Sequence, residues 1–192
     1  MTDKFNMGLF LWINSFRGLS PIVDSIFVFF SEAGPYLLLA ALFITWFKLG
    51  DKRRIILIEV ILASILGLVI NLAIGLFYFH PRPFMLGLCT PLIHHVPETS
   101  FPSDHATILF AASIYLIGFR RWIYLGSFIL VLAFLTSFGR VFCGVHFPLD
   151  IAGSLLVGAL SACIVFIIRP VLAKLCDRIL VECRKYNGKR KE

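Results

Sequence analysis

The sequence Arg140-Val-Phe-Cys-Gly-Val-His-Phe-Pro-Leu-Asp150 connects two long apolar runs of the chain. Within eleven residues it carries a guanidinium (Arg140), an imidazole (His146) and a carboxylate (Asp150). Ionisable side chains next to membrane-length apolar segments are unfavourable unless they are paired or have a function. We therefore expect these three side chains to belong to one site.

The composition indicates an integral membrane protein. Of the 192 residues, 59% are hydrophobic and 15% are charged, whereas soluble domains have about 45–50% apolar and about 25% charged residues. The chain is too short to add a separate soluble module to such a bundle. The predicted fold class is an all-α polytopic transmembrane helix bundle, a single domain over residues 1–192.

The apolar runs predict five membrane crossings, with six as the alternative. Residues 1–18 are expected to form an interfacial helix and residues 170–192 a basic cytoplasmic tail. Because Gly34-Pro35 interrupts the second apolar region, we interpret its first half, Pro21–Phe30, as a surface or partly embedded helix. The predicted crossings are Tyr36–Phe47 with its flanks, Ile55–Phe79, Ala106–Phe119, Ile123–Phe138 and Ile151–Ile168.

Several residues within these segments are assigned to packing. Small residues recur every four positions in the last run and predict a close helix contact. Two polar residues within the predicted crossing Ile55–Phe79, Glu59 and Asn71, are interpreted as packing residues too. Two outer cysteines are compatible with a disulfide, although we favour unpaired thiols. The small residues are Ser154, Gly158 and Ala162, the polar residues are Glu59 and Asn71, and the cysteines are Cys89 and Cys143.

The net charge of +7 is distributed unevenly. Cations gather in Lys48–Arg54, at Arg120-Arg121 and in the tail, which the positive-inside rule assigns to the cytoplasm. Because these cations flank apolar runs, we expect no nucleic-acid partner. The segments 80–104 and 140–150 then face outward, and they contain or adjoin all five histidines: His80, His94, His95, His105 and His146.

The outer segments contain the groups that hydrolysis of a phosphate without a metal would need: cations, a nucleophile and an acid. Arg82 and Arg140 are expected to clamp the phosphate. Ser103 and Asp104 precede an apolar run, so they lie near a helix N-terminus, which favours anions. The remaining candidates are His105 and His146 as acid and nucleophile, with Asp150 orienting an imidazole.

Taken together, these motifs resemble those of the type 2 phosphatidic acid phosphatase superfamily. The resemblance rests on Arg82-Pro83, on Pro102-Ser103-Asp104-His105, and on Arg140 followed by His146 and Asp150 at the family's intervals. It implies that His146 is a nucleophile forming a phosphohistidine, that Asp150 is its charge-relay partner and that His105 is the general acid. Arg82, Ser103 and Arg140 match phosphate ligands, and no metal or other cofactor is expected.

Three positions differ from the general pattern of the family. Gly75 stands where the first motif has Lys, and His80 is one candidate to replace that cation. Gly139 replaces a Ser, and Asp104 replaces a Gly. The Pro-Ser-Asp-His variant is similar to that of bacterial undecaprenyl pyrophosphate phosphatases. His94 and His95 are interpreted as polar surface residues of the outer loop.

The function that we predict is hydrolysis of a polyprenyl diphosphate, most simply undecaprenyl pyrophosphate, at the outer face of a bacterial inner membrane. Two alternatives remain at this stage. A phosphotransferase would use the same residues to pass the phosphoryl group to another lipid, and a transporter or flippase would only bind the lipid head group.

Overall fold

The computed structural model describes residues 4–189, apart from the side chains of residues 51–53 and 172–189. The described chain is helical and contains no strand, which confirms the predicted fold class. Its elements are α1 (Lys4–Asn14), α2 (Pro21–Lys48), α3 (Asp51–Phe77), η1 (Pro83–Leu86), α4 (Asp104–Ile117), η2 (Arg120–Trp122), α5 (Ile123–Phe142) and α6 (Pro148–Lys189).

Four helices of the described chain are long and apolar enough to cross a membrane: α2, α3 from Arg54, α5 with η2, and α6 as far as Val171. The helix α4 is a shorter apolar helix of 14 residues. It is therefore about 21 Å long at about 1.5 Å per residue. This is shorter than a hydrocarbon layer of about 30 Å. Because α4 packs against α2, α3, α5 and α6, it lies in the centre of the bundle.

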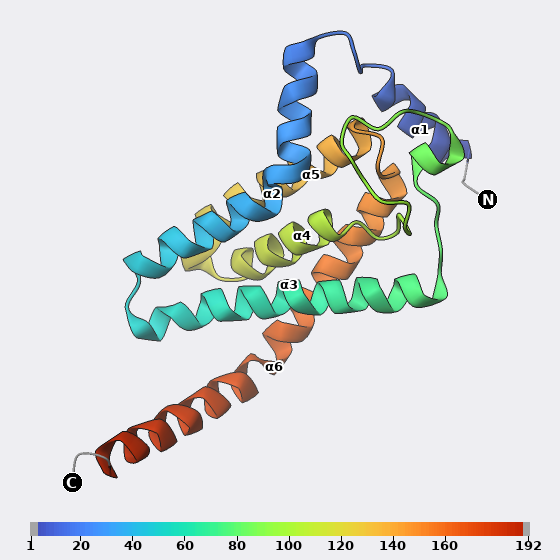
Figure 1. Ribbon diagram of the computed structural model, residues 1–192. Helices are drawn as coiled ribbons and strands as arrows, with labels where there is room; N and C mark the ends of the chain where they lie inside the picture. The colour runs from blue at the N-terminus through green and yellow to red at the C-terminus, as the bar shows by residue number, and fades with distance from the viewer. Residues whose placement is uncertain (1–3, 190–192) are drawn as a thin grey trace.

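The separate surface helix predicted for Pro21–Phe30 is wrong. Residues 21–48 form one continuous helix that contains Pro35, and Figure 1 shows that it bends along its length. Proline removes a backbone donor and crowds the preceding turn, which kinks a helix without always ending it. Gly34 allows a close contact with α5, because a Cβ atom there would lie 2.2 Å from Thr136 Oγ1.

The connections between helices separate into two groups at opposite ends of the bundle (Figure 1). The short α2–α3 and α4–α5 connections, which carry the cations, lie at one end. The long loop 78–103 and the α5–α6 connection lie at the other end, next to α1. This arrangement brings together the segments that carry the predicted site residues.

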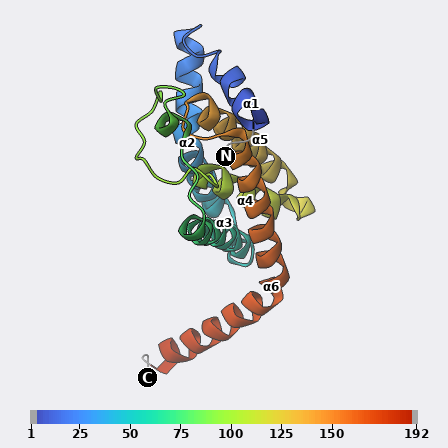
Figure 2. The same cartoon turned by 90° about the vertical axis from the view of Figure 1, so that its right-hand side faces the viewer.

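The packing of the last helix follows the predicted small-residue face. A Cβ atom on Gly158 would lie 2.8 Å from Phe110 Cβ and 2.9 Å from Ala111 N, so glycine permits the close approach of α6 to α4. Beyond the apolar run, α6 contains Pro170 and continues to Lys189, and Figure 2 shows this part bending away from the bundle.

Large hydrophobic side chains cover the outside of the bundle as well as its interior. Leu72, Leu76, Phe128 and Leu156 are examples of exposed apolar residues. An apolar exterior of this extent is typical of a surface that contacts lipid.

The polar residues within the spans make inter-helix contacts, as the packing interpretation predicted. The buried Glu59 carboxylate accepts hydrogen bonds from Tyr115 Oη (2.8 Å) and from Arg169 Nε (3.1 Å). Asn71 Nδ2 donates to Asp104 Oδ1 at 2.7 Å. Cys89 and Cys143 are free thiols, so the favoured alternative, unpaired cysteines, is confirmed.

The N-terminal helix α1 is tied to the connection that carries His146. Asn6 is buried, and its Oδ1 accepts a hydrogen bond from Leu149 N at 3.0 Å, at the start of α6. Phe10 is fully buried and its ring lies 5.2 Å from that of Phe147. The predicted interfacial segment is therefore helical, and one of its faces packs against the α5–α6 connection.

Candidate active site

A cleft of about 350 Å³ lies at the end of the bundle that carries the long loop. Of the seven predicted site residues, Arg82, Asp104, His105, Arg140 and His146 line it. The other two, Ser103 and Asp150, are fully buried and lie behind its wall. Three segments distant in sequence therefore meet at one place, as the motifs predicted.

The two ring nitrogens of His146 have different partners, one on Ser100 and the other on Arg82. Its Nδ1 lies 2.8 Å from the carbonyl oxygen of Ser100, an acceptor, so Nδ1 carries the proton. Its Nε2 lies 3.0 Å from Arg82 Nη1, a donor, so Nε2 presents a lone pair. In this tautomer Nε2 is the ring nitrogen that carries the lone pair.

Burial keeps this imidazole neutral. Removal from water lowers the pKa of His146 to about 3, and the nearby carboxylate of Asp150 opposes that effect only in part. A neutral imidazole is the form that can attack phosphorus. His146 lies in the short connection between α5 and α6, and Gly144 before it adopts a positive φ of 83°, a conformation that suits glycine.

Asp150 is held by several donors behind His146. Its Oδ2 accepts hydrogen bonds from Phe147 N (2.7 Å) and from Ser100 Oγ, and it lies 3.6 Å from His146 Nδ1. Its Oδ1 lies 3.1 Å from His80 Nδ1. A carboxylate with this many donors stays ionised and can stabilise positive charge on the imidazole.

Two arginines place cationic groups in the cleft although both are almost completely buried. Within the described chain, Arg82 Nε, Arg140 Nε and Ser103 Oγ are buried polar atoms without a hydrogen-bond partner. Buried polar atoms are normally satisfied, so the Nε donors of the two arginines that line the cleft are available to a ligand. Guanidinium and hydroxyl donors suit a phosphate.

The start of α4 supplies His105 and Asp104 to the cleft. Asp104 Oδ1 accepts a hydrogen bond from Asn71, which fixes this carboxylate to α3. The backbone N–H of Ser103 donates to Ser154 Oγ at 2.8 Å, so this donor is already used within the protein. Of the second motif, the imidazole of His105 is the side chain that can exchange a proton within the cleft.

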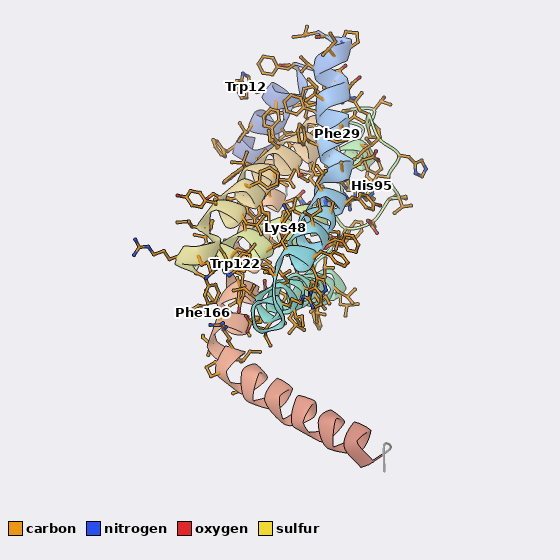
Figure 3. All side chains as sticks on the ribbon, turned by 90° about the vertical axis from the view of Figure 1, so that its left-hand side faces the viewer. Trp12, Phe29, Lys48, His95, Trp122 and Phe166 are labelled. Atoms are coloured by element: carbon orange, nitrogen blue, oxygen red, sulfur yellow. The ribbon has the colours of Figure 1, made fainter. Side chains whose placement is uncertain are left out.

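The structure corrects two expectations about the other histidines. His80 contacts Asp150 and stacks on Tyr78, so it is not the replacement for the missing first-motif Lys. His94 is exposed, as predicted, but His95 lines the cleft, with its ring centre 6.4 Å from that of His146. Figure 3 labels His95 on the long loop. Desolvation and the nearby arginines lower the pKa of His95.

Ser100 and Glu98 are contact residues that the sequence did not single out. Ser100 supports both His146 and Asp150, and Glu98 Oε1 lies 3.1 Å from Arg82 Nη2. Both lie in the long loop, and no sequence pattern specifies the path of this loop. Their closeness to the second motif was the one available signal.

One wall of the cleft is apolar. Leu68, Leu72 and Leu76 follow one another at four-residue spacing along one side of α3, and all three line the cleft. Leu72 and Leu76 are 68% and 74% exposed, so this stripe continues onto the outside of the bundle. The cleft therefore joins an anion-binding end to a lipid-facing surface.

Comparison with known proteins identifies the arrangement. Residues 56–174 match the model of the PAP2 superfamily. The chain belongs to this superfamily. It is a phosphatase, and its membrane helices and relatives make it a multi-pass membrane lipid phosphatase.

The relatives have similar lengths. The undecaprenyl-diphosphatase BcrC of Bacillus subtilis is 33% identical over 91% of this chain and 90% of its own length. The putative undecaprenyl-diphosphatase YbjG of Escherichia coli is 30% identical over 86% of this chain and 85% of its own length.

Two solved structures share the fold. Aquifex aeolicus LpxE has a TM-score of 0.71 and 28% identity, over 86% of this chain and 98% of that chain. A PAP2-type phosphatidylglycerolphosphate phosphatase from Bacillus subtilis has a TM-score of 0.66 at 19% identity, over 86% and 85%. The second similarity supports the fold alone.

Proposed function

We propose that this single-domain PAP2 phosphatase removes the terminal phosphate of a polyprenyl diphosphate, undecaprenyl diphosphate being the substrate that its relatives' names favour. The observation that carries the proposal is His146, whose Nε2 lone pair faces the cation of Arg82 in a cleft that has an apolar wall. The polar end suits a diphosphate and the leucine stripe suits a prenyl chain.

The proposed reaction has two steps. His146 Nε2 attacks the terminal phosphorus, His105 gives a proton to the leaving oxygen, and a phosphohistidine forms. Asp150 stabilises the charge that develops on the imidazole, through Nδ1. His105 then accepts a proton from water, which attacks the phosphohistidine and releases inorganic phosphate.

Phosphate binding is assigned to Arg82 and Arg140, which line the cleft and whose unpartnered Nε atoms support the role. It is assigned also to Ser103 of the second motif, whose unpartnered hydroxyl lies behind the cleft wall. Asp104 was expected to be a fourth binding residue, but a carboxylate repels a phosphate. Its hydrogen bond from Asn71 supports a positioning role at the start of α4. The arginines supply the charge that stabilises the transition state, so the mechanism needs no metal or other cofactor.

The proposed location is the bacterial inner membrane, with the cleft toward the periplasm or outside and the C-terminus in the cytoplasm. The support is the positive-inside rule, because the α2–α3 and α4–α5 connections lie at the end of the bundle opposite the long loop (Figure 1). These connections carry Lys48, Arg120 and Arg121. Recycling of a lipid carrier at the outer face would need this orientation.

The test is phosphate release by the purified protein from undecaprenyl diphosphate, undecaprenyl monophosphate and phosphatidic acid. We expect the highest kcat/KM for the diphosphate, and an acid-labile phosphoprotein that His146→Gln abolishes. Higher kcat/KM for either monoester would reject the proposed substrate. Phosphate transfer to added lipid A, without release, would indicate a phosphotransferase, and head-group binding without turnover would indicate a transporter.

A further inference from the structure

The donors of Arg82 are almost fully used by partners within the protein. Its Nη1 donates to Val145 O (2.9 Å) and His146 Nε2 (3.0 Å), and its Nη2 donates to Glu98 Oε1 and Thr99 O, both at 3.1 Å. A guanidinium has five N–H groups, and Nε alone lacks a partner. A phosphate can use the Nη donors only if it displaces one of these partners.

Glu98 is the partner that can leave. Val145 and Thr99 contribute backbone carbonyls, whereas Glu98 contributes a flexible side chain that is 55% exposed. A carboxylate that moves into water is hydrated there, so its release leaves no buried charge unpaired. Glu98 also lines the same cleft as His146, and its carboxylate offers Arg82 the same kind of acceptor as a phosphate.

His95 and its surroundings fit this exchange. His95 Nδ1 lies 3.8 Å from Glu98 Oε1 and 3.2 Å from the carbonyl oxygen of Val96. Glu98 therefore has a second polar neighbour in the loop when it leaves Arg82. The movement of Glu98 frees Arg82 Nη2, whereas the contact of His146 Nε2 is with Nη1 and does not involve Glu98.

We propose that Glu98 is an internal anion that competes with phosphate for Arg82: substrate displaces it, and its return expels inorganic phosphate after each turnover. Glu98 acts through Arg82, so it is a positioning residue. The inference rests on the proposed function in so far as it assigns phosphate binding to Arg82. It does not depend on which lipid is the substrate.

The experiment measures binding of inorganic phosphate to the purified protein by titration calorimetry, so lipid identity does not enter. Glu98→Gln keeps the shape and removes the charge, and Glu98→Ala removes both. We expect both variants to bind phosphate about tenfold more tightly, the lower end of the effect of a charge-assisted hydrogen bond, because Glu98 is partly exposed. Turnover should show a lower KM and a kcat that does not rise.

The matched control is Asp24→Asn, which makes the same charge change at the same end of the bundle. Asp24 accepts hydrogen bonds from Gly18 N and does not line the cleft. The affinity of the Asp24→Asn protein for phosphate should stay within about twofold of that of the wild type. Unchanged or weaker phosphate binding by both Glu98 variants would overturn the inference, and so would equal tightening by Asp24→Asn. Absence of phosphate binding in all proteins would instead count against the proposed function.

Discussion

Replacing Asp150 by Asn isolates the charge of this residue from its shape. The amide oxygen can keep the Oδ2 position, where it accepts from Phe147 N and Ser100 Oγ and lies near His146 Nδ1. The amide NH₂ then faces His80, whose ring can accept in its other tautomer. The fold should persist while the negative charge behind His146 disappears.

The expected effect follows from the 3.6 Å between Asp150 Oδ2 and His146 Nδ1. When Nε2 attacks phosphorus, the imidazole becomes positive, and at an effective dielectric constant of about 20 the attraction at this distance is about 4.6 kcal/mol. Loss of this interaction in the transition state should lower kcat by about 10³-fold. KM should change little, because Asp150 lies behind the wall of the cleft.

The assay is steady-state phosphate release from a prenyl diphosphate, with the thermal unfolding midpoint and phosphate binding measured on the same samples. Asp24→Asn again serves as the control, and its kcat should match the wild type. A folded Asp150→Asn protein that binds phosphate and retains more than about a tenth of the wild-type kcat would refute the charge argument.

Three further predictions concern the proton donor, the cations and burial. His105→Gln should reduce turnover of prenyl diphosphate by at least about 100-fold but affect p-nitrophenyl phosphate far less, because that leaving group needs no proton; equal losses would contradict the assignment. Turnover should persist in excess EDTA because arginines supply the positive charge; complete loss that magnesium reverses would argue against this mechanism. The pKa of His146 is about 3 in the fold against an ordinary 6.5, so the unfolded chain binds the proton first as pH falls. This group's contribution to stability is full above pH 6.5 and declines by about 1.4 kcal/mol per pH unit below it. His146→Gln should therefore lose less stability than the wild type between pH 7 and pH 5 in thermal unfolding; an equal loss would contradict the burial effect.

The long loop shows why part of the site escaped prediction. His95 and Glu98 reach the cleft because of the path of residues 78–103, which has no periodic pattern to read. Ser100 contributes its carbonyl oxygen to His146 and its hydroxyl to Asp150, and neither contact is encoded by spacing. His80 illustrates the opposite error, since closeness to Arg82 in sequence did not bring it to the cleft.

The α2 helix shows a similar limit for the fold. Gly34-Pro35 correctly indicated an irregularity, but a local signal does not distinguish a kink from a break. Packing decided the outcome, because α2 contacts α5 closely at Gly34, where Thr136 would leave no space for a side chain. Tertiary contacts can hold a proline-containing helix together when the freed backbone groups are accommodated.

The sequence by itself determined the membrane bundle, because apolar run length and cation position are local quantities set by transfer from water. It also determined that Arg140, His146 and Asp150 lie close together, because all three belong to one eleven-residue stretch that consists of a helix end and a turn. Only the tertiary structure decided what surrounds them: which tautomer His146 adopts, which donors hold Asp150 and which carboxylate occupies Arg82. Those contacts join residues far apart in the chain, and their strength depends on burial, which exists only once the helices have packed.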